Sequence, residues 1–279
     1  MNITVIGLGL IGGSIAKDLK SQLNVKVCGI DASEDHVKQA LDLGLIHESS
    51  DFNSGIANAD IVIVSIPVNK IELLLPELLD KINADTTVID VGSTKAEICR
   101  SVENHPKRNR FVACHPLAGT EFSGPSAAQR GLFRDKKNII CEADKSASDA
   151  LDTALRLFES LGMTTTFMSP SEHDKHLAYV SHLSHVSSFM LGLTVLDIEK
   201  DEKQIFNLAG TGFASTVRLA KSSPKTWSAI FGKNRKYLLE ALDSYIVHLQ
   251  NFRNMIDKND ISGTERLMNE SNQIKRILN

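Results

Sequence analysis

The chain has 279 residues, 42% of them hydrophobic and 23% charged, and this ordinary globular balance excludes disorder as its dominant state. A formal net charge of −3 and an aromatic content of 5% argue against nucleic-acid binding, which favours basic surfaces and stacking aromatic side chains. No apolar run reaches the ~18 residues of a membrane-spanning helix, so the sequence predicts a protein that does not cross a membrane.

Residues 1–168 alternate between short apolar runs and helical stretches. The predicted strands are Asn2–Ile6, Val25–Ile30, Ala59–Ile66, Thr86–Val91, Phe111–Cys114 and Asn138–Glu142, with β-branched compositions typical of a parallel sheet buried on both faces. The predicted helices are Gly12–Gln22, Glu34–Leu43, Asn69–Ile82 and Ser148–Leu161. Pro76 is expected to kink the third helix or to split it in two. The alternation predicts a doubly wound α/β domain of the Rossmann type.

Residues 169–279 show helical periodicity and no convincing strand. Within this part, apolar residues recur at spacings of three and four: Leu238, Leu242, Tyr245, Leu249, Phe252 and Ile256. Such a seam is compatible with a helix packed on its own domain and with a helix shared across a dimer interface. The sequence therefore predicts a helical substrate-binding and dimerisation domain, and a homodimer formed through these C-terminal helices.

A glycine-rich turn follows the first predicted strand. The segment Gly7-Leu8-Gly9-Leu10-Ile11-Gly12 has the G-x-G-x-x-G spacing and leads directly into a helix. In such turns the first glycine makes the bend, the second admits the pyrophosphate of a dinucleotide, and the third allows close packing of helix and strand. The pyrophosphate then lies at the helix N-terminus, so this segment is the predicted cofactor cradle.

Asp31 directly follows the second predicted strand, about 20 residues after the glycines, as the dinucleotide-binding pattern requires. A carboxylate at this position accepts hydrogen bonds from ribose hydroxyls and repels a 2′-phosphate, which favours NAD over NADP. The alternative is that Asp31 only caps the following helix. Ser65 and Pro67 follow another strand, and we place them in the same cofactor crevice because ligands bind at the carboxyl ends of strands.

Two polar residues follow the later strands. Ser93 lies in Asp90-Val91-Gly92-Ser93-Thr94-Lys95, where the alternative role is a helix N-cap. His115 follows the strand that ends at Cys114, and a histidine with its ordinary pKa near ~6.5 takes up a proton at neutral pH. Oxidation of an alcohol needs such a base. The alternative is a structural histidine in the loop.

The second half of the chain offers further candidates. His182 and His185 are three residues apart on one predicted helical face, but no H-E-x-x-H or cysteine set completes a metal site, so we predict no metal. Arg218 follows a glycine-flanked segment and is suited to hold a carboxylate through two hydrogen bonds, or else is a solvated surface residue.

The four cysteines are Cys28, Cys99, Cys114 and Cys141. They are widely separated and contain no C-x-x-C pair, a pattern that fits reduced thiols better than a disulfide framework. We therefore expect a cytoplasmic protein.

Taken together, the motifs resemble those of the prephenate/arogenate dehydrogenase family of tyrosine biosynthesis. The segments that carry the resemblance are the glycine-rich turn, Asp90–Lys95, His115-Pro116-Leu117-Ala118-Gly119-Thr120-Glu121, Glu172-His173-Asp174, Ser181–His185 and Phe213…Arg218, in this order. The resemblance extends from residue 2 to about residue 252, and the order and spacing of the motifs are more specific than any one of them.

This resemblance implies an NAD-dependent oxidative decarboxylation of prephenate to 4-hydroxyphenylpyruvate. It implies that His115 is the base, that Ser93 orients His115 or the substrate hydroxyl, and that Arg218 holds the ring carboxylate. The remaining pocket around the pyruvyl side chain is expected to contain Thr120, Glu121, Ser181 and His185. Two positions depart from the family pattern: Ser184 replaces a usual proline, and Ser215 replaces an acidic residue before Arg218, which is then held differently.

Three alternatives remain open at this point. Arogenate differs from prephenate only in an amino group on the side chain, so an arogenate dehydrogenase is the nearest of them. A β-hydroxyacid dehydrogenase or imine reductase has the same architecture but places a lysine or asparagine where this chain has His173, His176 and His182. A non-catalytic NAD sensor would need neither His115 nor Arg218.

Overall fold

The computed structural model describes residues 1–22, 25–200, 202 and 204–277. In this part of the chain an eight-stranded sheet has the order β3-β2-β1-β4-β5-β6-β7-β8. The strands are β1 (Asn2–Ile6), β2 (Lys26–Ile30), β3 (Glu48–Ser49), β4 (Ile61–Val64), β5 (Thr87–Asp90), β6 (Phe111–Pro116), β7 (Lys137–Cys141) and β8 (Thr164–Met168). All neighbouring strands are parallel except β6 and β7.

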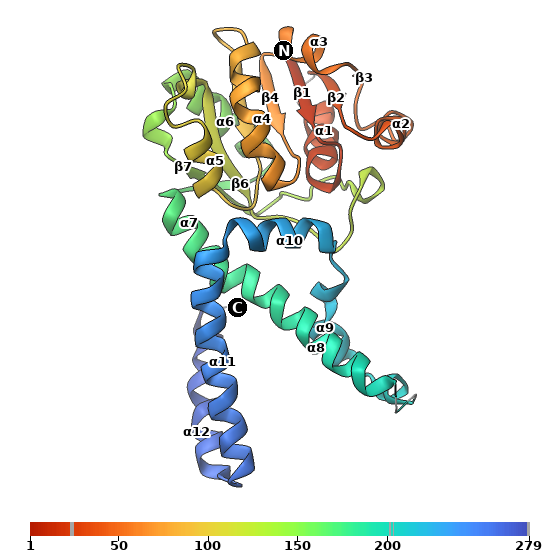
Figure 1. Ribbon diagram of the computed structural model, residues 1–279. Coiled ribbons are helices and arrows are strands. Elements are labelled where there is room, and N and C mark those ends of the chain that lie inside the picture. The colour runs from red at the N-terminus through yellow and green to blue at the C-terminus, as the bar shows by residue number, and fades with distance from the viewer. Residues whose placement is uncertain (23–24, 201, 203, 278–279) are drawn as a thin grey trace.

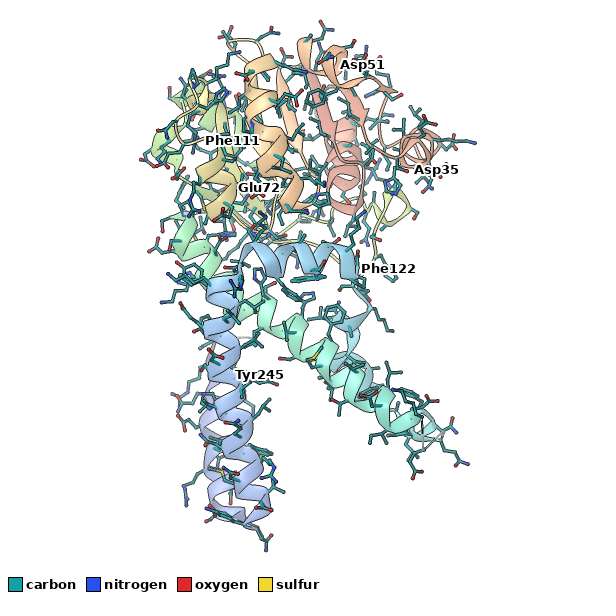
Figure 2. All side chains as sticks on the ribbon, in the orientation of Figure 1. Asp35, Asp51, Glu72, Phe111, Phe122 and Tyr245 are labelled. Carbon is teal, nitrogen blue, oxygen red and sulfur yellow. The ribbon has the colours of Figure 1, made fainter. Side chains whose placement is uncertain are left out.

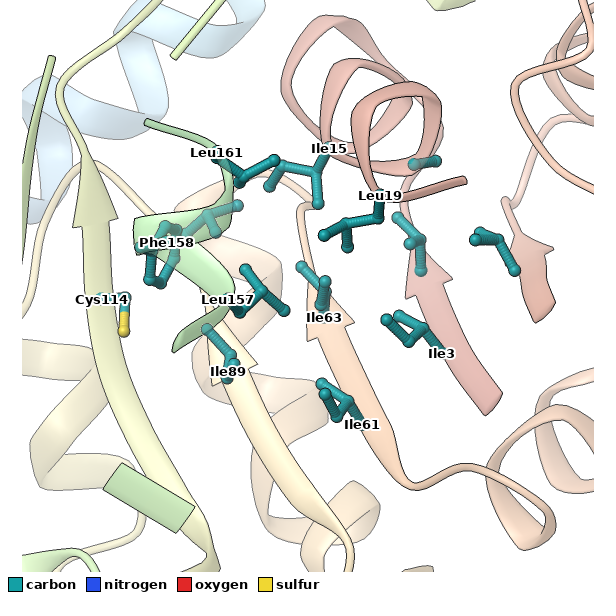
Figure 3. Packing of buried hydrophobic residues seen from close by; sticks show 14 of the residues in the cluster. Ile3, Ile15, Leu19, Ile61, Ile63, Ile89, Cys114, Leu157, Phe158 and Leu161 are labelled. Atoms are coloured by element: carbon teal, nitrogen blue, oxygen red, sulfur yellow. The ribbon is translucent and has the colours of Figure 1, made fainter. Parts of the chain in front are cut away.

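Helices cover both faces of this sheet (Figure 1). They are α1 (Leu10–Gln22), α2 (Glu34–Asp42), α3 (Phe52–Ala57), α4 (Val68–Lys81), α5 (Ala96–Ser101) and α6 (Ser148–Ser160). On one face Ile15 of α1 and Phe158 of α6 pack with Ile63 of β4 (Figure 3), and on the other Leu75 of α4 packs with Val64. The burial of alternate strand residues in two separate apolar clusters is what makes the domain doubly wound, as the sequence predicted.

The predicted strands are confirmed with small changes at their ends, but the expectation of a wholly parallel sheet is wrong. Residues 117–136, which join β6 to β7, contain only a short 3-10 turn at Pro125–Ala127. A parallel pair needs a long crossover connection, usually a helix, whereas this connection returns the chain antiparallel, and Pro116 pairs with Asn138. The sequence also missed β3, β8, α3 and α5, all of which are short or partly exposed.

Of the two effects expected of Pro76, a kink or a split, the split is wrong, because α4 runs through Pro76 as one element. Proline removes one backbone hydrogen bond. The buried side chains of Ile71, Leu75 and Leu78 lie on both sides of that position and hold the two halves of the helix against the sheet.

Beyond β8 the described residues form helices without further strands, as predicted. They are α7 (Pro170–Leu177), α8 (Leu183–Glu199), α9 (Thr211–Thr216), α10 (Pro224–Lys233), α11 (Arg235–Asp257) and α12 (Ile261–Ser271). In Figure 1 α10 runs beneath the sheet domain, and α11 and α12 project away from it together. Lys233 of α10 forms an ion pair with Glu72 of α4 and so ties the helical part to the sheet domain.

The predicted seam of α11 is buried only in its first turns. Leu238 is buried, whereas Leu249 is 50% and Ile256 60% exposed, and Figure 2 shows this half of the helix reaching away from the sheet domain. The outer half of α11 therefore presents apolar side chains to solvent. Among the described residues, no helix combines the length and the apolar character needed to span a membrane.

Candidate active site

The turns that follow β1, β4, β5 and β6 meet at one edge of the sheet, because these strands are adjacent and parallel. They carry Gly7, Ser65 and Ser93, and His115 is the last but one residue of β6, whose strand runs two residues further than the sequence predicted. The topology therefore brings the predicted cofactor turn and the predicted base to the same edge.

The glycine-rich turn has the shape of a cradle for a pyrophosphate. Gly7 has a φ of +95°, and a Cβ there would lie 2.4 Å from the carbonyl oxygen of Ser65. A Cβ on Gly12 would lie 2.0 Å from the carbonyl oxygen of Gly7. Neither position therefore accepts a side chain. By contrast, no heavy atom lies within 4 Å of a Cβ placed on Gly9, so the turn is open where the N-terminus of α1 offers unpaired N–H groups.

The other residues of this turn present backbone to the crevice. The side chain of Leu8 is fully buried and packs against Gly29, while Leu10 and Ile11 begin α1 and are partly buried. Pro67 is the exposed N-cap residue of α4. A dinucleotide at this turn would thus meet main-chain groups, as is usual for a pyrophosphate site.

Asp31 does not cap α2, because Ser33 does so by accepting a hydrogen bond from the backbone N–H of His36. The Asp31 carboxylate instead accepts the backbone N–H groups of Leu8, at 2.8 Å, and Ser33, at 2.9 Å. Its side chain is 13% exposed, and a carboxylate has acceptor positions beyond these two bonds. The acidic group is therefore held against the glycine-rich turn with capacity left for ribose hydroxyls.

His115 is the best-defined functional candidate at this edge. It is 8% exposed, and its Nδ1 lies 2.8 Å from Nε2 of His173 on α7. Nδ1 of the fully buried His173 lies 2.8 Å from Oδ1 of Asp174. Nε2 of His115 has no hydrogen-bond partner among the described residues, so this atom is available to a substrate.

Asp174 is in turn held by the loop after β5. Its Oδ1 accepts the backbone N–H of Lys95 at 2.8 Å, and its Oδ2 accepts that of Ala96 at 2.9 Å. From the other side, Nδ2 of Asn234 donates to the backbone oxygen of Asp174 at 2.6 Å and lies 3.1 Å from Nδ1 of His182. These contacts join α7, the β5–α5 loop and the start of α11 around one carboxylate.

A buried ion pair lies directly beneath the histidine. Nζ of Lys95 contacts the carboxylate of Asp90, and both side chains are fully buried. Nζ also donates to the carbonyl oxygen of Cys114 at 2.7 Å, and Asp90 accepts the backbone N–H groups of Gly92 and Cys114. The pair therefore fastens the end of β5 to the end of β6, immediately before His115.

Burial keeps these histidines uncharged. The pKa of His115 lies well below 6.5 because burial penalises the imidazolium, and His173, Lys95 and His182 add to the effect. Burial also lowers the pKa of His173, although Asp174 opposes the shift. At neutral pH His115 is therefore a neutral imidazole, the state that a proton acceptor requires.

Arg218 lies in the 3-10 turn after α9, and its Nη1 is 3.1 Å from Oε2 of Glu121 in the loop after β6. The pKa of Glu121 is lowered by a hydrogen bond from its own backbone N–H and by Arg218. Arg218 is thus paired with Glu121, whereas Oγ of Ser215 donates to the carbonyl oxygen of Gly212 and makes no hydrogen bond to the arginine. Glu121 also lines a cavity of about 520 Å³, together with Gln129 and Lys221.

The remaining predicted pocket residues lie on the π-helical turn Ala178–His182, on α8 and in the loop after β6. The ring of His185 stacks on Trp227 with centroids 3.3 Å apart, and its Nδ1 lies 3.0 Å from the carbonyl oxygen of Ser181. His182 ends a π-helical turn at Ala178–His182 and is buried beside Asn234, and its ring, like that of His185, packs against Trp227, so the two histidines lie on one side of the helix as their spacing predicted. Thr120 caps its own turn by accepting the backbone N–H of Phe122.

Sequence reasoning missed the roles of the residues that support His115. They are Asp90, Lys95, His173, Asp174 and Asn234. The adjacent His173-Asp174 pair at the start of a helix was the available signal, but its partner is 58 residues away in the sequence. Within the described part of the chain, no cluster of three or more His, Cys, Asp or Glu side chains has the arrangement of a metal site.

An open glycine-rich turn, a carboxylate held against it and a neutral buried histidine at the same sheet edge define the class of dinucleotide-dependent dehydrogenases. Comparisons with known proteins identify the family within this class. Residues 15–166 match the description "Prephenate dehydrogenase, nucleotide-binding domain", and residues 169–270 match "Prephenate dehydrogenase, dimerization domain". The chain belongs to the prephenate dehydrogenase family.

Individual relatives agree with this assignment. The chain is 32% identical to a prephenate dehydrogenase of Bacillus subtilis, over 92% of this chain and 71% of that protein. It is 31% identical to a cyclohexadienyl dehydrogenase of Zymomonas mobilis, over 93% of this chain and 89% of that protein. The crystal structure of A. aeolicus prephenate dehydrogenase with hydroxyphenyl propionate and NAD+ superimposes with a TM-score of 0.89 at 31% identity, covering 99% of this chain and 97% of that one.

Proposed function

We propose that this protein is an NAD-dependent prephenate dehydrogenase that oxidatively decarboxylates prephenate to 4-hydroxyphenylpyruvate. The observation that carries the proposal is His115, a buried neutral imidazole with a free Nε2 at the edge of the sheet that holds the glycine-rich turn. The structural relative from A. aeolicus, which contains NAD+ and a hydroxyphenyl compound, supports both the cofactor and the substrate class.

The cofactor site is assigned to the glycine-rich turn, Asp31, Ser65 and Pro67. Backbone groups of Gly7 to Gly12 would receive the pyrophosphate, and Asp31 would accept the ribose hydroxyls and repel the extra phosphate of NADP. When bound, the oxidised dinucleotide supplies the hydride acceptor. The chain's own contribution is to hold it beside the base and to exclude water.

In the proposed reaction His115 accepts the proton of the substrate's ring hydroxyl at Nε2. Loss of this proton raises the electron density at the carbinol carbon and weakens its C–H bond. Departure of CO₂ makes the ring aromatic, so the reaction is effectively irreversible. Ser93, partly exposed in the loop beside His115, is assigned to orient that hydroxyl, because His173 already holds the other ring nitrogen of His115.

Arg218 is assigned to the ring carboxylate. A guanidinium has five N–H donors, and Glu121 uses one of them, so others remain for a substrate. Because that carboxylate is lost in the reaction, Arg218 should contribute to binding more than to the chemical step. Thr120, Glu121, Ser181 and His185 are assigned to the pyruvyl side chain.

The two parts of the chain are assigned separate tasks. Residues 1–168 bind the dinucleotide and contribute His115 and the loop after β6 to the substrate site, and residues 169–279 supply the rest of that site and form a homodimer. The description of the second family match as a dimerization domain supports this assignment, as do the exposed apolar side chains of Leu249, Phe252 and Ile256. The four buried thiols, all free, support a cytoplasmic location.

Sedimentation tests the dimer. Replacement of both Phe252 and Ile256 by Glu should convert the protein to a monomer, since it places charges in the proposed apolar interface. Leu73→Glu is the matched control, because Leu73 is 69% exposed on α4 of the sheet domain. A wild-type protein that sediments as a monomer at micromolar concentration would exclude the dimer.

Arogenate is the second candidate substrate, because the Synechocystis arogenate dehydrogenase structure has a TM-score of 0.77 at 26% identity and covers 99% of this chain. Absorbance at the NADH band decides between the two, with prephenate and arogenate each assayed against NAD and NADP. We expect kcat/KM to be highest for prephenate with NAD. Faster turnover of arogenate would transfer the assignment to that substrate, and no reduced dinucleotide with either would refute the proposed function.

A further inference from the structure

The contacts behind His115 form a continuous chain that ends on a carboxylate. Nδ1 of His115 is 2.8 Å from Nε2 of His173, and Nδ1 of His173 is 2.8 Å from Oδ1 of Asp174. The backbone N–H groups of Lys95 and Ala96 donate to the two oxygens of that carboxylate. Each link is buried, so water does not compete for any of these atoms.

This series of hydrogen bonds determines which ring nitrogens carry protons. A carboxylate that already receives two backbone N–H groups accepts hydrogen bonds and donates none, so Nδ1 of His173 must carry the proton of their shared bond. If His173 is neutral, its Nε2 is then an acceptor. The 2.8 Å contact needs one proton between the two rings, and Nδ1 of His115 supplies it. The lone pair of His115 is consequently on Nε2.

We propose that Asp174, acting through His173, is the positioning residue that sets the tautomer and orientation of His115, so that the Nε2 lone pair faces the substrate hydroxyl. This inference rests on the proposed function for the identity of the proton donor. Neither His173 nor Asp174 touches the substrate, since both lie on the far side of the His115 ring.

The hydrogen-bonded series His115–His173–Asp174, called the relay from here on, also acts during turnover. When Nε2 of His115 takes the substrate proton, the ring becomes a cation whose Nδ1–H already points at His173. His173 is polarised by Asp174, whose negative charge partly balances the new positive charge. Within the relay itself only the new Nε2–H bond of His115 forms, and this proton leaves from Nε2 after product release.

The relay joins the two parts of the chain. His115 is on β6 of the sheet domain, whereas His173 and Asp174 are on α7, the first helix after β8. Asp174 is fixed to the β5–α5 loop through backbone bonds and to Asn234 at the start of α11. The base is therefore correctly oriented only when the helical part is docked on the sheet.

The charged surroundings of the relay come from three elements. Lys95 and Asp90 lie beneath His115 at the end of β5, His182 approaches from the π-helical turn, and Asp174 lies behind His173. Only Asp174 adds a negative charge to the relay itself, because Lys95 neutralises Asp90. Removal of the Asp174 charge should therefore make protonation of the histidine pair harder.

Nuclear magnetic resonance tests the tautomers without substrate. Nitrogen-15 spectra of the histidine-labelled wild-type enzyme with bound NAD, at pH 8, should show His115 and His173 both protonated at Nδ1, with His115→Asn used to assign the signals. Asp174→Asn should remove this pattern from both rings. A His115 ring protonated at Nε2 in the wild-type enzyme would overturn the proposal, even if the enzyme oxidises prephenate.

Kinetics test whether the relay matters for the reaction. His173→Asn and Asp174→Asn should each lower kcat by about 10- to 10²-fold, part of the 10²–10⁴ that a positioned base contributes, with KM for prephenate unchanged within about twofold. In Asp174→Asn the acid limb of kcat/KM should move to lower pH. His176→Asn is the matched control, because His176 is exposed one turn further along α7.

The outcomes separate the two proposals. Folded His173→Asn and Asp174→Asn proteins with wild-type kcat would refute the relay. If these variants do not fold, the wild-type spectrum alone decides the tautomers. A wild-type enzyme that has the predicted tautomers but oxidises neither prephenate nor arogenate would refute the proposed function and leave the arrangement of the relay standing.

Discussion

At the scale of single residues, the properties of His115 come from its surroundings rather than from its sequence position. Burial lowers its pKa well below 6.5, so the ring is a weak base in equilibrium terms. Because its pKa is low, the ring is unprotonated at neutral pH and can accept a proton. The contact with His173 holds one ring nitrogen and leaves the other for chemistry.

Replacement of His115 tests its role as the base. His115→Asn should lower kcat by about 10²–10⁴-fold with little change in KM for prephenate, because proton transfer is lost while the binding groups remain. Steady-state measurement of NADH formation gives both constants. Turnover close to that of the wild-type enzyme would show that another group accepts the proton.

Arg218 should affect the binding of prephenate more than the chemical step. Arg218→Gln is expected to raise KM for prephenate by about 10- to 10²-fold, since a charge-assisted hydrogen bond contributes about 1.5–3 kcal/mol, with a smaller effect on kcat. Arg156→Gln is the control, because Arg156 is an exposed arginine on α6. An unchanged KM in Arg218→Gln would show that Arg218 is only a surface partner of Glu121.

At the scale of elements, the turn between β1 and α1 shows that its glycines have different roles. The close approach of Gly7 and Gly12 to backbone oxygens makes them structural, whereas the space at Gly9 is open and leaves room for the proposed ligand. The difference arises from how the strand packs against the helix. We therefore expect substitutions at Gly7 and Gly12 to affect stability, and a substitution at Gly9 to affect cofactor binding.

Two alanine variants test this distinction. Gly12→Ala should lower the free energy of unfolding by about 1–3 kcal/mol and weaken NAD binding, because its Cβ meets a backbone oxygen at 2.0 Å. Gly9→Ala should leave the unfolding free energy nearly unchanged and raise KM for NAD. Thermal denaturation and titration with NAD measure the two effects, and equal destabilisation of both variants would contradict this interpretation.

The elements that the sequence missed share a physical feature. β8 contains Thr164, Thr165 and Thr166 at the sheet edge, and its side chains are exposed or only partly buried, so it lacks the apolar run that identified the inner strands. The apolar residues of β7 predicted the strand itself, but they did not predict that it runs antiparallel to β6. Strand direction depends on the connection, which leaves no periodic pattern in the strand itself.

At the scale of the whole molecule, several histidines are buried uncharged where the helical part meets the sheet. Burial lowers the pKa of His182 from 6.5 to about 4, and it also lowers that of His115 and His173. The unfolded chain takes up these protons at a higher pH than the folded protein does. The stability that these histidines contribute is therefore present above pH 6.5 and is lost as the pH falls towards 4.

Chemical denaturation at several pH values tests this linkage. The free energy of unfolding should fall between pH 6.5 and about 4, and His182 alone should account for up to about 3 kcal/mol of the loss. His176→Asn, which removes an exposed histidine, should show the same dependence as the wild-type protein. A free energy that does not change between pH 7.5 and 5 would contradict the buried neutral state.

The sequence by itself determined the doubly wound fold, the dinucleotide cradle and the position of His115 at a strand end. These features depend on local patterns, namely apolar runs, glycine spacing and the rule that parallel strands end at one edge. The positions of Gly7, Asp31 and His115 relative to their own strands were enough to place them at this edge.

Only the tertiary structure decided what surrounds the base. His173 is 58 residues from His115 in the chain, and Glu121 is 97 residues from Arg218, so no spacing in the sequence predicts either contact. These pairs form because α7 and the segment after α9 dock against the edge of the sheet. The proposed tautomer of His115, the support of Arg218 and the burial that keeps the histidines neutral all follow from that docking.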